Sequence, residues 1–144
     1  MIPSTAEFEA PRPPKALRYS LWAVQIFLAL GFAASGAAKA TQPIDVLVRQ
    51  MQMLWVPAVP VWLVRFTGVA ELLGAAGLIL PAATRIQPRL TALAGAGLVT
   101  LTLFAAAFHA SRGETFMLPV TFLLSGLAAF VVWGRLSPAR IPAR

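Results

Sequence analysis

Four apolar stretches, each about twenty residues long, constrain the fold of this chain more than any other feature. They cover residues 19–38, 61–80, 90–108 and 115–134, and the first, third and fourth contain no charged residue. A helix of that length crosses the hydrocarbon core of a bilayer. Leu, Ala and Gly prevail, whereas the alternating apolar-polar pattern of membrane β-strands is absent from the sequence. We therefore predict an all-α membrane protein, a bundle of four transmembrane helices.

The composition supports a membrane location and excludes several kinds of site. Of the 144 residues, 58% are hydrophobic and 12% are charged. A soluble domain of this length has too little interior to bury so much apolar surface. The chain has no cysteine and one histidine, so we expect no thiolate chemistry, no metal site and no redox cofactor held by the chain itself. Motifs for phosphate loops, dinucleotide binding and zinc proteases are also missing from the sequence.

The basic residues predict the orientation of the bundle. The net charge is +7, and the Lys and Arg residues flank the apolar stretches, which favours lipid headgroups over nucleic acid as their partners. The side that carries both termini would hold Arg12, Lys15, Arg18, Arg85, Arg89, Arg135, Arg140 and Arg144, and the opposite side Lys39, Arg49, Arg65 and Arg112. Because basic residues concentrate in cytoplasmic loops, both termini are expected in the cytoplasm.

The segments outside the four spans differ in character. Residues 1–18, rich in proline, are interpreted as a disordered cytoplasmic tail, residues 19–136 as the transmembrane domain, and residues 137–144 as a second tail of the same kind. The first apolar run is longer than that of a usual signal peptide, so we expect an anchor, with cleavage as the alternative. Residues 40–60 are too apolar for a free loop. They are expected to form a short amphipathic segment at the interface or capping the bundle, or simply to pack on the spans.

Glu71 is a lone carboxylate near the middle of the second apolar stretch. An ionisable group at the bilayer centre costs about 2.5–3.5 kcal/mol on insertion scales, and such groups often mark functional sites. Small residues stand three and four positions away, at Thr67, Gly68, Gly74 and Ala75. Small residues allow another helix to approach closely, so Glu71 is expected to face the interior of the bundle.

Other polar residues share one half of the membrane with Glu71. Lys39 ends the first span, Arg65 lies one turn inside the start of the second and His109 ends the third. Arg65 lies about 120° around the helix from Glu71, so Lys39 and His109 are the favoured partners. Two interpretations stay open: a ligand or proton site, or an ion pair that fixes helix register. Arg112 and Glu114, in the turn after His109, are interpreted as structural.

Several of these residues form ordered motifs. They are Ser35-Gly36 followed by Lys39, then R-x-x-G-x-x-E from Arg65 to Glu71, and H-x-x-R-G-E from His109 to Glu114. With them, residues 21–136 resemble the DoxX-like family of small bacterial four-helix membrane proteins. The resemblance implies the bacterial inner membrane. The family takes its name from a subunit linked to quinone reduction in sulfur oxidation, and some members are associated with oxidative-stress systems.

The resemblance and the polar residues lead to one main hypothesis and two alternatives. The first is a redox- or stress-associated subunit that binds a quinone or another lipophilic ligand at Glu71, with Lys39, His109 and Arg65 adjusting the charge of the site. If it takes part in catalysis, it would be an accessory subunit of a quinone-linked oxidoreductase, with electrons supplied by a partner protein. The alternatives are a non-catalytic scaffold or assembly factor, and a small transporter that would work as a homo-oligomer.

Overall fold

The computed structural model describes residues 13–137 and 139–143. Within this part of the chain, four helices are long and apolar enough to cross a membrane, and no β-strand occurs. The helices are α1 (Lys15–Thr41), α3 (Val61–Thr84), α4 (Arg89–Ser111) and α5 (Leu118–Leu136). The all-α, four-helix fold class predicted from the sequence is confirmed.

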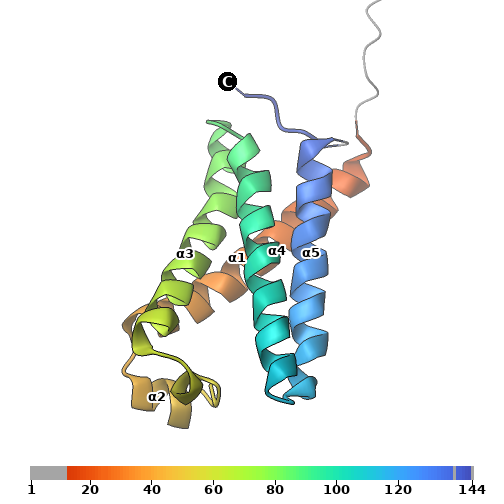
Figure 1. Cartoon of the computed structure of the whole chain (residues 1–144). Helices are drawn as coiled ribbons and strands as arrows, with labels where there is room; N and C mark the ends of the chain where they lie inside the picture. The colour runs from red at the N-terminus through yellow and green to blue at the C-terminus, as the bar shows by residue number, and fades with distance from the viewer. Residues whose placement is uncertain (1–12, 138, 144) are drawn as a thin grey trace, which may run out of the picture.

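The helices pack as two pairs that are joined through the middle of the bundle. Helix α1 packs mainly against α3, α4 packs against α5, and α3 joins α4. Helix α1 runs obliquely to the other three, so its contact with α5 is less extensive (Figure 1). The start of α1 and the C-terminal segment lie at one end of the bundle, and the short helix α2 (Ile44–Arg49) lies at the other (Figure 1). The two ends therefore differ in the residues that they present.

The outside of the bundle is apolar on every helix. The core holds Leu28, Phe32, Leu78, Leu98 and Val131. Large apolar side chains on the outer faces are nevertheless mostly exposed, for example Phe27, Leu73, Leu93, Phe104 and Leu123. Exposed apolar surface of this extent is unfavourable in water. The protein is therefore a membrane protein whose outer faces contact lipid.

Helix α1 begins earlier than the sequence predicts. Its first residue is Lys15, and Pro14 precedes it with an extended backbone. The assignment of residues 15–18 to a disordered tail is therefore wrong. Lys, Ala, Leu and Arg are good helix formers. The charged residues Lys15 and Arg18 therefore mark the end of the apolar span but not the end of the helix. Residues 1–12 lie outside the described part of the chain, so the tail predicted there stays a prediction.

Pro81 lies within α3, one residue beyond the second apolar stretch defined from the sequence. The helix continues to Thr84, and Arg85 follows in the left-handed conformation with φ of 60°. Proline removes one backbone donor from a helix, and transmembrane helices tolerate this where neighbours supply partners. Here Gln25 of α1 donates from Nε2 to the carbonyl oxygen of Leu78 at 2.5 Å. The carbonyl group that Pro81 leaves without its helical donor is that of Gly77, four positions earlier, so the bond from Gln25 adds a donor at the next carbonyl and does not replace the missing one.

The connection between α1 and α3 closes one end of the bundle. It contains α2 and a short 3₁₀ helix, η1 (Val56–Ala58). Leu47 and Val56 are almost completely buried against Ala38 and Val64. The short amphipathic segment expected between the first two spans thus contains the helix α2, and of the alternatives left open it caps the bundle by packing on the ends of α1 and α3.

The C-terminal segment is also packed, contrary to the disorder expected for it. Ala139 is buried, and its N–H donates to the carbonyl oxygen of Gly134 at 2.8 Å. Arg140 donates from Nη2 to the carbonyl oxygen of Leu136 at 3.1 Å. These contacts satisfy carbonyl groups that the end of α5 leaves without helical partners, which explains why a polar, proline-containing segment is held in place.

Candidate functional site

Lys39 and Glu71 form a buried ion pair between α1 and α3. Nζ of Lys39 lies 2.5 Å from Oε1 of Glu71, and the two side chains are 12% and 8% exposed. Glu71 belongs to the buried face of its helix, together with Val64, Gly68, Ala75 and Leu78. This is the direction expected from the small residues around Glu71, and Lys39 is one of the two partners that the sequence favours.

Two glycines bring the ion pair together. A Cβ atom on Gly68 would lie 2.8 Å from Cβ of Lys39 and 2.7 Å from the backbone nitrogen of Ala40. A Cβ atom on Gly36 would lie 3.0 Å from Cβ of Glu71 and 2.7 Å from the carbonyl oxygen of Gly68. Each helix thus places a glycine opposite the charged residue of the other. Only glycine permits the backbones to come this close at the crossing.

Arg65 contacts the pair through the backbone rather than through Glu71. Its Nη1 donates to the carbonyl oxygen of Lys39 at 2.6 Å. That carbonyl group lies in the last turn of α1, where helical partners run out. Arg65 therefore caps α1 beside Lys39, in agreement with its expected poor alignment with Glu71.

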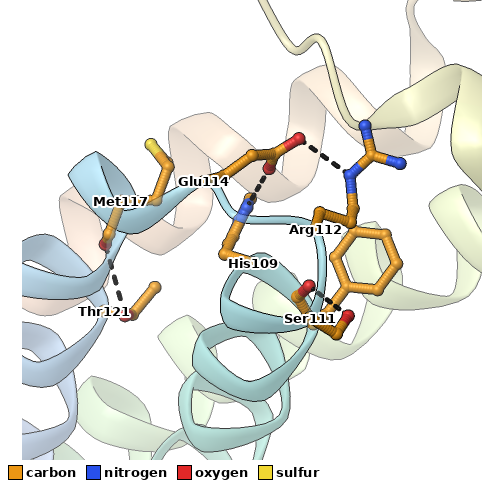
Figure 2. A network of polar contacts seen from close by, with 7 residues as sticks. His109, Ser111, Arg112, Glu114, Met117 and Thr121 are labelled. Carbon is orange, nitrogen blue, oxygen red and sulfur yellow. Dashed lines mark hydrogen bonds and ion pairs between the residues drawn. The ribbon is translucent and has the colours of Figure 1, made fainter.

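His109 is held by Glu114, which lies in the turn between α4 and α5 (Figure 2). Nδ1 of His109 lies 2.6 Å from Oε2 of Glu114, and Nε of Arg112 donates to Oε1 of the same carboxylate at 2.7 Å. The hydrogen bond with His109, followed by that with Arg112, lowers the pKa of Glu114 below its ordinary value of 4.5. Glu114 therefore orients His109, a role that the sequence does not predict for it.

The Lys39–Glu71 pair and the His109–Glu114 pair border one large cavity. Its volume is about 670 Å³, and its wall is mostly apolar. Lys39, Glu71, His109 and Glu114 all line it, as does Trp55, whose ring centroid lies 5.6 Å from Nζ of Lys39. Arg65 does not line it. Cavities of about 300–1,000 Å³ with apolar walls and a few convergent polar groups are typical of small-molecule sites.

One carboxylate oxygen in this cavity wall has no partner. Oε2 of Glu71 is buried and accepts no hydrogen bond from the described residues. A buried acceptor without a donor is unfavourable, and native proteins usually satisfy such atoms with protein, water or a ligand. Oε2 itself is closed off from the cavity that Glu71 lines, so a ligand hydroxyl or amine would satisfy it only after the carboxylate turns toward that space.

The cavity is bordered by residues on the lipid-facing surface. Phe27 of α1 and Val120 of α5 line it, and so does Phe116 in η2 (Thr115–Met117), which precedes α5. These three side chains are at least half exposed. The cavity therefore reaches the outer surface between α1 and α5, where a lipophilic molecule would enter from the bilayer.

The fold and the site define a small multi-pass membrane protein whose polar side chains gather around a cavity at one end of a four-helix bundle. The model of the DoxX-like family matches residues 23–131. The chain belongs to this family. No curated protein and no solved structure matches it significantly.

Proposed function

We propose that the cavity beside Glu71 binds a quinone, or another lipophilic ligand with hydroxyl or carbonyl groups. The observation that carries this proposal is that Glu71, whose carboxylate has one unpartnered oxygen, lines a large, mostly apolar cavity. An ion pair that only fixed the helix register would need neither the free acceptor nor the space. The apolar wall suits a ring and a hydrocarbon tail, and the polar residues suit the oxygen atoms of the ring.

Each polar residue has a distinct role in this proposal. Glu71 accepts a hydrogen bond from a ligand hydroxyl at Oε2 while Lys39 holds Oε1. The ammonium group of Lys39 has further N–H groups for a ligand carbonyl oxygen. His109, with Nδ1 engaged by Glu114, offers its other ring nitrogen to the ligand. Arg65 acts indirectly, because it fixes the end of α1 that carries Lys39.

In the proposed redox role, the polar residues of the cavity exchange the protons of the quinone. Conversion of a quinone to a quinol takes two electrons and two protons. In this proposal Glu71 and His109 transfer protons to or from the ligand oxygen atoms, and a redox partner protein exchanges the electrons. This makes the chain an accessory subunit of a quinone-linked, redox- or stress-associated system rather than a complete oxidoreductase.

The proposed location is the bacterial inner membrane, with both termini in the cytoplasm. The excess of basic residues at the end that carries the start of α1 and the C-terminal segment supports this orientation. The Glu71 cavity would then lie in the outer half of the bilayer. Reporter fusions at the C-terminus test the orientation: green fluorescent protein should fluoresce, and alkaline phosphatase should be inactive. The reverse result would overturn it.

The direct test of ligand binding compares two carboxylate-to-amide variants. Glu71→Gln keeps the shape of the side chain but loses its charge, and Asp45→Asn makes the same change at an exposed position outside the cavity. Binding of a short-chain quinone and its quinol is measured by calorimetry on purified protein in detergent. We expect Glu71→Gln to raise Kd about tenfold or more, because a buried charged hydrogen bond is lost.

Thermal unfolding of each variant shows whether it remains folded. If folded Glu71→Gln binds both ligands as the wild type does, or if the wild type binds neither, the proposal is overturned.

A scaffold that docks a partner protein is the second candidate. It is favoured by Met51 and Leu54, which are 43% and 61% exposed at the end closed by α2. In that case a partner would copurify with the wild type and be lost from a Met51→Ser/Leu54→Ser variant, whereas Glu71→Gln would leave the complex intact.

A further inference from the structure

The opposite end of the bundle contains a second cavity, which the quinone proposal does not use. Its volume is about 280 Å³. The turn between α3 and α4, the end of α5 and the C-terminal segment form its wall, and three arginines line it: Arg89, Arg135 and Arg140. Among the residues that the structure describes, none of those lining it carries a carboxylate. The cavity is therefore strongly positive.

Arg135 is the unusual member of this set, because it is buried. It is 6% exposed, although it carries a guanidinium group. Nε donates to Oε1 of Gln25 at 2.7 Å, and Nη1 reaches the carbonyl oxygen of Ala139 only at 3.4 Å. Nη2 has no hydrogen-bond partner among the described residues. A buried charge is normally paired, so this arrangement calls for an anion.

No carboxylate of residues 13–137 or 139–143 forms an ion pair with Arg135. The ion pairs of the described residues use the carboxylates of Glu71 and Glu114, both at the other end of the bundle. The indole ring of Trp22 lies beneath the guanidinium group, with 5.3 Å between Cζ of Arg135 and the ring centroid. The amide of Gln25 and the ring of Trp22 hold Arg135 in place, but neither neutralises it.

Two further features favour an anion at this position. Arg89 is the first residue of α4, a helix of 23 residues whose N-terminal end carries a partial positive charge. Guanidinium groups match phosphate oxygens better than any other side chain, because their N–H groups form a planar fork. Three of them around one cavity suit a group with several oxygen atoms.

We infer that Arg89, Arg135 and Arg140 bind a phosphate group at this end of the bundle. The cavity lies where the spans leave the hydrocarbon region, at the level of lipid headgroups, and Trp22 and Trp133 are placed as interfacial tryptophans are. The phosphate group of an anionic phospholipid and free inorganic phosphate share the required chemistry. The experiment therefore has one arm for each source.

The variants remove the exposed members of the cluster and leave Arg135 and its packing untouched. Arg89→Gln/Arg140→Gln lowers the charge of the cavity, and Arg85→Gln changes an exposed arginine of the same turn that does not line it. Thermal unfolding identifies any variant that fails to fold.

In the lipid arm, native mass spectrometry of purified protein measures retention of phosphatidylglycerol relative to phosphatidylcholine. In the phosphate arm, thermal unfolding in a neutral detergent is followed with sodium phosphate against sodium chloride at equal ionic strength. We expect a preference for the anionic lipid phosphatidylglycerol over zwitterionic phosphatidylcholine, for phosphate over chloride, or for both. The arginine pair variant should reduce it about tenfold, whereas Arg85→Gln should leave it unchanged.

Preference for phosphatidylglycerol alone assigns the site to a lipid, and stabilisation by phosphate alone assigns it to the free ion. The inference is overturned if the wild type shows no preference in either arm. It is also overturned if the pair variant and Arg85→Gln reduce the preference equally, because that result reflects overall charge.

Discussion

Lys39 and Glu71 are each opposed by a glycine of the other's helix: Gly68 faces Cβ of Lys39, and Gly36 faces Cβ of Glu71. The ammonium nitrogen and the carboxylate oxygen are 2.5 Å apart. On each helix the glycine stands three positions before the charged residue, so the two share one face of the helix. The close crossing of α1 and α3 and the position of the ion pair thus have the same cause.

The first prediction concerns these glycines. Gly68→Ala would place a methyl group 2.7 Å from the nitrogen of Ala40, so the two helices must separate. We expect a loss of about 1–3 kcal/mol in stability together with weaker ligand binding. Gly126→Ala is the matched control, because nothing lies within 4 Å of the added methyl group. Unfolding in detergent measures the effect, and equal stability of the two variants would contradict the close crossing.

The second prediction separates stability from function in the ion pair. Lys39→Met leaves the buried Glu71 unpaired, at a cost of about 3–5 kcal/mol. The double variant Lys39→Met/Glu71→Leu removes both charges and should recover most of that loss. If the pair serves a ligand, the double variant should be stable and yet fail to bind quinone. Recovery of binding along with stability would show that the charges are only structural.

The third prediction concerns acid. Because the folded-state pKa of Glu114 is lowered, its stabilising contribution is complete above the ordinary carboxyl pKa of 4.5. That contribution is lost as the pH falls below 4.5 and through the lowered pKa. Thermal unfolding between neutral and acidic pH should therefore show a decline that is smaller in Glu114→Gln. An identical decline in both proteins would exclude Glu114 as its source.

The fourth prediction tests the cap that Arg65 places on α1. Arg65→Ala removes the donor to the Lys39 carbonyl and should cost about 1–3 kcal/mol. Amide exchange should increase in the last turn of α1, and quinone binding should weaken less than in Glu71→Gln. Arg49→Ala, at an exposed position, should change neither. Protection of α1 equal to that of the wild type would show that Arg65 does not hold this end.

The sequence predicts the spans well because length and lack of charge are sufficient to define them. It also predicts that Glu71 faces inward and that Arg65 is poorly aligned with it, since both follow from helical spacing. The crossing at Gly36 and Gly68 needs the register between two helices, which no single helix specifies. The ligand role of these residues stays a prediction.

Other features were not predictable because they depend on contacts between distant residues. From the sequence, Glu114 is interpreted as a structural residue of a turn, and only the fold shows that it contacts His109. Arg135 reads as a topology signal, yet it is buried on Gln25, more than a hundred positions away in the chain. Pro81 directly follows the second apolar stretch, and apolar length alone does not show that α3 continues past it to Thr84.

The most direct test of the central proposal maps where a photoactivatable quinone analogue attaches. After irradiation of the purified protein, mass spectrometry identifies the labelled peptides. We expect labels on the cavity-lining parts of α1 and α5, around Phe27 and Val120, which excess unlabelled quinone removes and Glu71→Gln strongly reduces. Labels spread over lipid-facing residues outside the cavity, unaffected by competitor or by Glu71→Gln, would contradict it.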